Sequence, residues 1–402
     1  MKVRFLRKLY QIVFPLGLSL LLVSNAVGVG QKKVLHVFND TPAANPASNL
    51  VFDAQGNLYG STNRSGRRAC KCGTIFRLSP QAGGGWQYQV LYQFKGDGDG
   101  GYPVGNLVFD NAGNLYGASY YGNGNVFRLI QQADGSWTEA AVYTFTGIPD
   151  GARPVAGLTI DSAGNLYGTT GAGGAYGEGT VYKLTPEGGG EWSEAILYSF
   201  SGADGMNPEA GVTLDKSGNL YGTTEDGGQY RYGTVFELVN NAGNWTETVV
   251  HSFNGSVTDP GSPYAGVVFD SSGNLYGTET GYSGVVFRLK PSLDGGWTET
   301  ILHTFGKGND GDLPWSDLVF DSAGNLYGTT YVGGKDYQGI IYKLAPVLGG
   351  HWRYTVFHNF NFADGANPAN NPVTFDANGN LFVATDGGGL PQDYGVVLEI
   401  AP

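Results

Sequence analysis

Charged residues and cysteines are scarce in this chain of 402 residues. Only 14% of the residues are Asp, Glu, Lys or Arg, and there are two cysteines and two methionines. So little charge excludes a disordered acidic protein and a coiled coil, which both depend on abundant charged side chains. Glycine is abundant instead, with 67 residues, and the aromatic residues make up 13%. Together with 18 prolines, this glycine content disfavours long helices and indicates a folded, β-rich protein.

A hydrophobic run stands near the amino terminus. Lys2, Arg4, Arg7 and Lys8 precede a mostly apolar stretch from residue 9 to 23, which is followed by Ser24-Asn25-Ala26. This layout is typical of a signal peptide, and the stretch is shorter than the about 20 residues of a membrane span. We therefore expect residues 1–26 to be a signal peptide and residues 27–33 to be a short flexible start. The mature protein should be secreted or periplasmic, with no membrane span.

The charge of the mature chain restricts its partners. Loss of residues 1–26 lowers the formal net charge from −12 to −16, because four basic residues and no acidic ones are removed. So acidic a surface repels nucleic acid and anionic lipid, and neither is expected as a partner. The two cysteines, Cys70 and Cys72, lie in one loop without a neighbouring histidine, so they predict a local disulfide or two free thiols.

One phrase, Asp-x-x-Gly-Asn-Leu-Tyr/Phe, recurs seven times. A period near 54 residues suits one four-stranded blade of a β-propeller. The aspartates that begin the phrase are Asp53, Asp110, Asp161, Asp215, Asp270, Asp321 and Asp376. Each of these carboxylates is expected to accept hydrogen bonds from its own turn, while the glycine supplies a positive φ.

A single unit predicts four strands. Residues 157–160, 166–170, 180–184 and 192–200 read as short strands separated by turns and glycine-rich loops. Six fourth strands begin at tryptophan, and the seventh is missing, because the chain stops after a third strand at residues 395–400. Residues 34–38 match the missing strand. We therefore predict an all-β, seven-bladed β-propeller over residues 34–402, in which residues 34–38 complete a last blade built from residues 372–400.

This closure removes two exposed strand edges. We expect Val34, Leu35 and Phe38 to be buried in the completed ring. A compact ring of this kind is expected to be a monomer.

The repeated phrases resemble those of a known family. They read Gly-Leu-x-Phe-Asp-x-x-Gly-Asn-Leu-Tyr-Gly-Thr-Thr, Gly-Thr-Val-Phe-x-Leu and Trp-x-Glu-x-x-Leu-Tyr-x-Phe, and together they resemble the GloVer tandem repeat of bacterial choice-of-anchor exported proteins. The resemblance covers essentially the whole mature chain, and a more distant likeness is to NHL-type propellers. It implies a secreted or surface-located propeller and brings no established reaction with it.

Motifs for catalysis or metal binding are not evident. No serine or cysteine triad, phosphate loop or clustered metal site is found in the sequence. Four of the five histidines, His36, His251, His303 and His358, share a repeat position with Tyr residues of other blades, which favours a packing role. Segments 97–100 and 309–312 resemble calcium loops without the full ligand spacing. No cofactor is predicted, and calcium is the one candidate left open.

The loops that join second to third strands, and fourth strands to the next blade, should open on the face opposite the Asp-x-x-Gly turns. These loops are aromatic, and aromatic side chains offer a large contact area at small entropic cost. The alternative is that the Tyr before each third strand packs between blades. The predicted ligand-binding residues are Tyr121, Tyr176, Tyr232, Tyr282, Trp315, Tyr337 and Tyr394.

The sequence therefore predicts a binding module for a polysaccharide or a protein ligand on this face. The alternative is a carbohydrate-active hydrolase or lyase, with a carboxylate pair as acid and base at the mouth of the channel. Glu225 and Asp226 are the candidate catalytic residues, and Asp204, Glu209 and Asp386 map to the same face.

Overall fold

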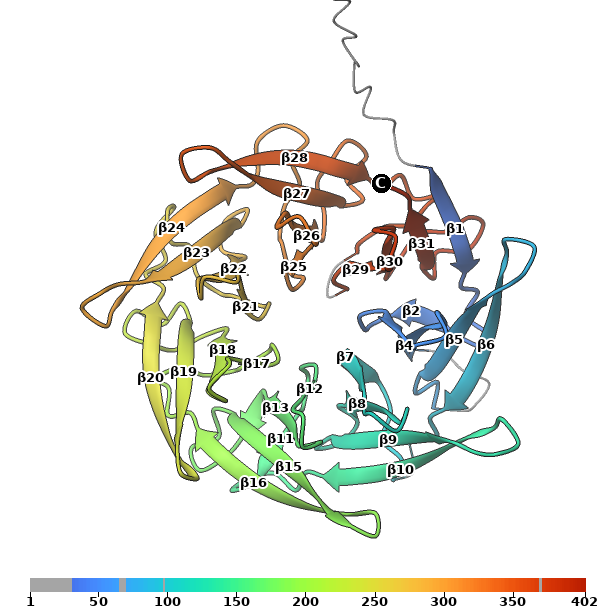
Figure 1. Ribbon diagram of the computed structural model, residues 1–402, viewed down its shortest axis with the longest axis horizontal. Helices are drawn as coiled ribbons and strands as arrows, with labels where there is room; N and C mark the ends of the chain where they lie inside the picture. The colour runs from blue at the N-terminus through green and yellow to red at the C-terminus, as the bar shows by residue number, and fades with distance from the viewer. Residues whose placement is uncertain (1–30, 65–69, 97, 369–370) are drawn as a thin grey trace, which may run out of the picture.

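The chain forms a ring of seven antiparallel sheets around a central axis (Figure 1). This computed structural model describes residues 31–64, 70–96, 98–368 and 371–402, in which every regular element is a strand. None of the described segments is a helix long and apolar enough to cross a membrane. The prediction of an all-β, seven-bladed β-propeller is confirmed. The predicted signal peptide, residues 1–26, lies outside the described residues.

The blades are numbered I to VII, and the strands of each follow one another from the channel outwards, with the N-terminal β1 as the outer strand of blade VII. Blade I contains β2 (Ala44–Pro46), β3 (Val51–Phe52), β4 (Leu58–Arg64), β5 (Thr74–Pro80) and β6 (Trp86–Gln93). Blade II contains β7 (Pro103–Phe109), β8 (Leu115–Ser119), β9 (Asn125–Gln131) and β10 (Trp137–Thr144). Blade III contains β12 (Thr159–Ile160), β13 (Leu166–Thr170), β15 (Thr180–Gly188) and β16 (Glu191–Ser199), and its loops pair as β11 (Gly151–Ala152) and β14 (Ala172–Gly173). Blade IV contains β17 (Thr213–Leu214), β18 (Leu220–Thr224), β19 (Thr234–Asn241) and β20 (Asn244–Ser252). Blade V contains β21 (Val268–Phe269), β22 (Leu275–Glu279), β23 (Val285–Pro291) and β24 (Trp297–Thr304). Blade VI contains β25 (Val319–Phe320), β26 (Leu326–Thr330), β27 (Ile340–Val347) and β28 (His351–Asn359). Blade VII contains β29 (Thr374–Phe375), β30 (Leu381–Thr385), β31 (Val396–Ile400) and β1 (Lys32–Val37).

The hydrophobic core lies between neighbouring blades. The second strands from β8 to β30 are buried along their whole length, whereas the fourth strands alternate between half-buried and exposed residues. At the boundary of blades IV and V, for example, Tyr221 and Phe253 of one blade pack with Leu275 and Phe287 of the other. Each blade is thus covered on both sides, which explains why its inner strands read as short apolar runs.

The repeated aspartates form the turns predicted for them. In blade I, Asp53 Oδ1 accepts the backbone N–H groups of Gln55 and Asn57, each at 2.9 Å, and Asp53 Oδ2 accepts the side chain of Asn57 at 2.7 Å. The same contacts recur in every blade. The glycine of each turn has a φ between 79° and 85°. These seven turns occupy one face of the ring.

The ring closes as predicted. β1 pairs antiparallel with β31, from Lys32 opposite Ile400 to Val37 opposite Val396, and Figure 1 shows the C-terminus beside β1. The expectation that Val34 is buried is wrong, because its side chain is 38% exposed. Val34 lies in the outer half of an outermost strand, before a bulge, where the next blade does not cover it. Phe38 is fully buried and Leu35 is half-buried against the same cluster.

The loop between β4 and β5 of blade I contains a disulfide between Cys70 and Cys72. This is one of the two states that the sequence left open for the pair. Both sulfur atoms lie under the loop that connects blade I to blade II, where a Cβ added at Gly96 would meet them.

Candidate functional site

The central channel is interrupted by a contact between nearly opposite blades. Asn106 of blade II donates from Nδ2 to Asp317 Oδ2 at 3.1 Å, and Asp317 precedes the inner strand of blade VI. Asp317 Oδ1 accepts the backbone N–H of Gly266 at 2.8 Å. On the turn face lies a cavity of about 600 Å³, and on the loop face a pocket of about 430 Å³. Both share Asn106 and Asp317 in their walls, so the contact separates them.

Each blade has a residue in the left-handed conformation before its innermost strand, and one of these residues, Arg153, lines the loop-face pocket. Its N–H donates to Asn123 of the preceding blade at 2.8 Å, and its carbonyl accepts the N–H of Gly171 at 2.9 Å. Each of these residues precedes a proline and has a φ between 52° and 59°. They are Asn45, Tyr102, Arg153, Asn207, Ser262, Leu313 and Asn367. Because backbone groups make these ties, the side chains of these residues are free to differ between blades.

Two aromatic side chains of the pocket wall, Tyr264 and Trp315, pack with a third, Tyr331, and we call the three the aromatic platform. The rings of Trp315 and Tyr331 stack with centroids 4.6 Å apart and planes 12° apart, and the ring of Tyr264 lies 5.5 Å from that of Trp315. Trp315 and Tyr264 line the pocket directly. Trp315 Nε1 is buried and has no hydrogen-bond partner among the described residues. The same is true of Asn63 Oδ1, whose residue also lines the pocket. Such groups are normally satisfied in a folded protein.

Carboxylates stand next to this platform. Glu209 lines the pocket, and its Oε1 lies 3.7 Å from Arg153 Nη2. Burial raises the pKa of Glu209 above its ordinary value against the attraction of Arg153, with Glu225 and Asp226 adding to the rise. Burial likewise raises the pKa of Glu225, which hydrogen bonding with Tyr264 partly offsets. Each glutamate therefore holds a proton more readily than an exposed one would.

The structure brings only part of the predicted site together. Trp315 lines the pocket, and Glu225 and Asp226 interact with Glu209 at its edge. Asp226 Oδ2 is already engaged by Asn207 Nδ2 at 3.2 Å. The charges of both predicted catalytic residues act on Glu209, and burial raises the pKa of Glu225 as it raises that of Glu209.

The other predicted ligand-binding residues lie away from this pocket. Tyr121 stacks on Tyr102 at 6.0 Å, and Tyr394 lines a separate shallow depression. Tyr232 packs over Gly255, whose carbonyl accepts the Tyr282 hydroxyl at 3.3 Å. Two further side chains are well exposed, Tyr176 at 66% and Tyr337 at 78%. As ligand contacts these residues stay predictions.

Three residues of the pocket, Arg153, Asn106 and Asp317, were not predicted from the sequence. A signal for Asp317 exists, because its repeat position holds Gly157, Gly211 and Gly266 in other blades. Aligning the seven units position by position would single out such departures. The proximity of Arg153 to Glu209 has no such signal, since it depends on the left-handed backbone before the proline.

In the two segments that resemble calcium loops, Asp99 and Asp310 accept hydrogen bonds from the backbone. Asp99 accepts the N–H groups of Lys95 and Gly96, and Asp310 accepts those of Gly306 and Lys307. These carboxylates shape the loop between one blade and the next. Whether calcium binds there stays an open prediction.

Together these observations define a seven-bladed propeller with an aromatic and acidic pocket at one end of its channel. The family model of the Gloeobacter/Verrucomicrobia repeat matches residues 22–158, 119–292 and 216–402. The chain therefore belongs to this repeat family, and the resemblance seen in the sequence is confirmed. No curated protein sequence matches it closely.

Solved structures share the propeller fold at low sequence identity. A "putative 6-phosphogluconolactonase" from Bacteroides uniformis is 14% identical, with a TM-score of 0.55 over 78% of this chain and 85% of that one. A second protein of that description, from Bacteroides fragilis, is 16% identical, with a TM-score of 0.55 over 79% of this chain and 85% of that one. Identities this low show the fold alone.

Proposed function

We propose that this protein is a binding module that holds a polysaccharide in the loop-face pocket. The observation that carries the proposal is the aromatic platform beside the carboxyl groups of Glu209 and Glu225. Flat aromatic faces cover the apolar side of a sugar ring, while carboxylates pair with its hydroxyls. A pocket of about 430 Å³ is within the usual size range of ligand sites.

The equivalent positions of other blades show which residue can replace Trp315 without unfolding the protein. Val104 and Val155 occupy its position in blades II and III, so W315V is expected to keep the fold. A glycan array identifies ligands, and calorimetric titration then measures their affinity for the wild type, W315V and the control Y337A. We expect W315V to bind about tenfold to hundredfold more weakly, because an anchoring aromatic side chain contributes about 2 kcal/mol or more. Y337A should bind like the wild type.

Unchanged affinity in W315V would contradict the proposed pocket. Loss of binding in Y337A would place the ligand on the outer loops instead. A protein ligand, the other partner expected from the sequence, would show itself by binding that no glycan on the array competes for.

A second candidate function is glycan hydrolysis or cleavage by a lyase, with Glu209 and Glu225 as acid and base. The specific observation in favour is that two neighbouring carboxyl groups share a raised pKa, which general acid catalysis requires. Release of new reducing ends from a bound polysaccharide would support it. E225Q and E209Q should then abolish release while binding is retained, whereas a binding module releases none in any variant.

We also propose that the protein acts as a monomer outside the cytoplasm, after removal of residues 1–26. The support is the amino-terminal sequence and the acidic charge. Amino-terminal sequencing of the exported protein, with its mass in solution, tests both points. A start at Met1 or a stable dimer would contradict them.

A further inference from the structure

Each boundary between blades carries a repeated set of polar side chains. A Tyr or His near the end of one fourth strand contacts an Asp in the loop that follows, as Tyr92 contacts Asp99 at 2.6 Å and His303 contacts Asp310 at 3.2 Å. The next blade adds a third side chain, which in blades I to VI is a Glu or Tyr two residues after the Trp of the fourth strand. At the boundary of blades VI and VII, Lys32 of β1 takes this place and pairs with Asp364.

Where the fourth strand carries Tyr, the next blade contributes Glu. Where the fourth strand carries His, the next blade contributes Tyr at two boundaries. The two His-Tyr boundaries are alike, since His36 stacks on Tyr88 at 3.8 Å and His303 stacks on Tyr354 at 3.6 Å. The Tyr-Asp-Glu boundaries are Tyr92 with Asp99 and Glu139, Tyr143 with Asp150 and Glu194, and Tyr198 with Asp204 and Glu247.

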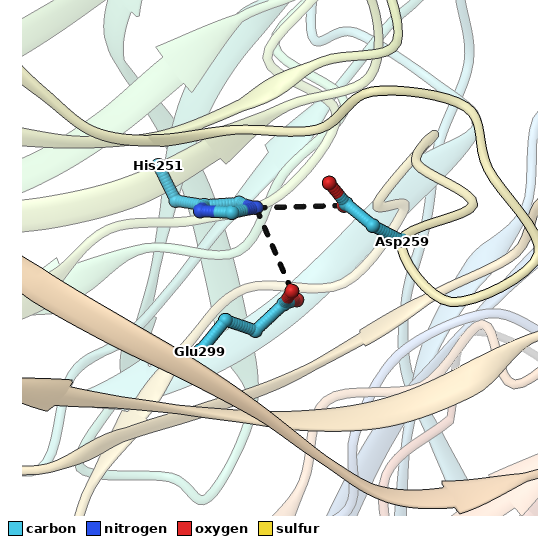
Figure 2. Close-up of side chains that lie close together, drawn as sticks. All are labelled: His251, Asp259 and Glu299. Carbon is cyan, nitrogen blue, oxygen red and sulfur yellow. Dashed lines mark hydrogen bonds and ion pairs between the residues drawn. The ribbon is translucent and has the colours of Figure 1, made fainter.

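The boundary between blades IV and V combines a His with a Glu. His251 Nε2 lies 3.4 Å from Asp259 Oδ1 and 3.9 Å from Glu299 Oε2, and Figure 2 shows both carboxylates turned towards the same ring nitrogen. The three donor atoms lie within 4.8 Å of one another. Asp259 belongs to the loop from β20, which carries His251, to β21 of blade V, while Glu299 is on β24 of blade V.

A fourth carboxyl group lies next to these three. Glu279, at the end of β22, is fully buried, and its Oε2 accepts the N–H of Gly261 at 2.6 Å. Its Oε1 has no hydrogen-bond partner among the described residues, and the charges of Glu299 and Asp259 act on it. In the other blades this position holds Thr or Ser: Thr62, Ser119, Thr170, Thr224, Thr330 and Thr385. A buried carboxyl group of this kind needs a cation or a proton.

The donors are linked by one long hydrogen bond, between His251 and Asp259, and their spacing also leaves room for an ion. Ligands at about 2.0–2.1 Å from a tetrahedral ion are about 3.3 Å from one another, close to the 3.4 Å between His251 Nε2 and Asp259. The 3.9 Å to Glu299 is too long for a hydrogen bond. Asp259 Oδ2 accepts the N–H of Asn254 at 3.1 Å, which orients the carboxylate as outer contacts of metal ligands do.

We propose that His251, Asp259 and Glu299 form a site for one divalent transition-metal ion of the Zn²⁺ and Mn²⁺ class, which links blades IV and V, with the buried carboxyl group of Glu279 beside the site. An imidazole nitrogen together with two carboxylates is a donor set for such ions, whereas Ca²⁺ and Mg²⁺ prefer oxygen ligands only. The side chains of His251 and Glu299 keep 22% and 17% of their surface exposed, which leaves the ion a path from solvent.

The test uses the full mature protein stripped with a chelator. Calorimetric titration with Zn²⁺, and elemental analysis after gel filtration, should show one ion per chain and a higher unfolding temperature. H251Y copies the set of Tyr198, Asp204 and Glu247, so it should fold and bind Zn²⁺ at least about a hundredfold more weakly. E279T copies the other blades and should weaken binding about tenfold.

A reciprocal variant serves as the matched control. Y198H creates a His-Asp-Glu set between blades III and IV, where Thr224 stands in place of the fourth carboxyl group. We expect it to bind no second ion. A second ion of equal affinity in Y198H would refute the role of Glu279.

Other outcomes would overturn the site itself. They are the absence of Zn²⁺ uptake by the wild type, uptake unchanged in H251Y, or Ca²⁺ bound as tightly as Zn²⁺. If circular dichroism shows that H251Y is unfolded, the near-isosteric E299Q takes its place, with the same expected loss of binding.

Discussion

At the scale of single residues, the blades are held together by matched volumes. In blade IV, Gly222 of the second strand lies opposite Phe236 of the third, and a Cβ added at Gly222 would come within 2.5 Å of the Phe236 ring. Blades I to VI all combine a glycine with an aromatic residue in this way. Blade VII uses Val383 opposite Leu398 instead. The larger residue on one strand is therefore balanced by a smaller one on the other.

This balance can be measured with a double-mutant cycle in blade IV. We expect G222V to lower the free energy of unfolding by about 3 kcal/mol through overpacking, and F236L to lower it by about 1 to 2 kcal/mol through a cavity. The double variant copies blade VII and should be more stable than the sum predicts, by about 1 kcal/mol or more. Denaturant unfolding of the four proteins gives this coupling. Strictly additive losses would show that the two positions are independent.

Residue by residue, the sequence predicts the turns well and the site poorly. The Asp-x-x-Gly turns depend on neighbours in the chain, so Asp53 and Gly56 could be assigned from their spacing alone. Trp315 was predicted, but its partner Tyr331 comes from another loop, and their stacking depends on how two segments approach each other. His251 and Glu299 meet only because two blades pack together.

At the scale of elements, β1 is the strand on which the ring depends. It pairs with β31 along its length, and the Phe38 N–H, just beyond it, donates to the Gly395 carbonyl at 3.0 Å. Lys32 adds an ion pair with the carboxylate of Asp364 in the loop between blades VI and VII. The sequence predicted this strand because residues 34–38 repeat the pattern of a fourth strand. It could not predict that Val34 is exposed, since this depends on how far the neighbouring blade covers the outer strand.

Deletion of residues 31–39 should lower the unfolding temperature strongly and promote aggregation. Burial of Phe38 and Leu35 contributes at most on the order of 5 kcal/mol, and the deletion also leaves β31 with an unpaired edge. The measurement is thermal unfolding with light scattering, and the control is a chain that begins at residue 31. A synthetic peptide of residues 31–39 should restore part of the loss. Thermal unfolding identical to that of the control would refute this role of β1.

At the scale of the whole molecule, acidic groups recur around the ring at the blade boundaries. Burial, with a smaller effect of the nearby Asp99, Asp150 or Asp204, raises the pKa of three glutamates to about 7. They are Glu139, Glu194 and Glu247, and each has a buried Oε1 without a hydrogen-bond partner among the described residues. The folded state therefore binds more protons than the unfolded chain, whose glutamates titrate near pH 4.3.

This difference fixes the direction of the pH dependence. Because the pKa values are raised on folding, the stabilisation is complete below about pH 4.3 and is lost as the pH rises through about 7. We expect the free energy of unfolding to fall between pH 5 and 8, by about 1 kcal/mol per group once solvent screening is allowed for, and the unfolding temperature to fall with it. The triple variant E139Q/E194Q/E247Q should reduce this slope, whereas the exposed control E191Q should keep it.

A slope in the triple variant as steep as in the wild type would exclude these glutamates as its source. An unfolding temperature that rises from pH 5 to pH 8 would show that other groups dominate the titration.

The pairing of Lys32 with Ile400 also determines when the ring can close during synthesis. A ribosome delivers β1 first and β31 last, so the earliest strand has no partner until nearly all of the protein has been made. Until then the growing chain is an arc with two free edges, open to any other strand it meets. A chaperone would matter most in the interval between the synthesis of β1 and the synthesis of β31.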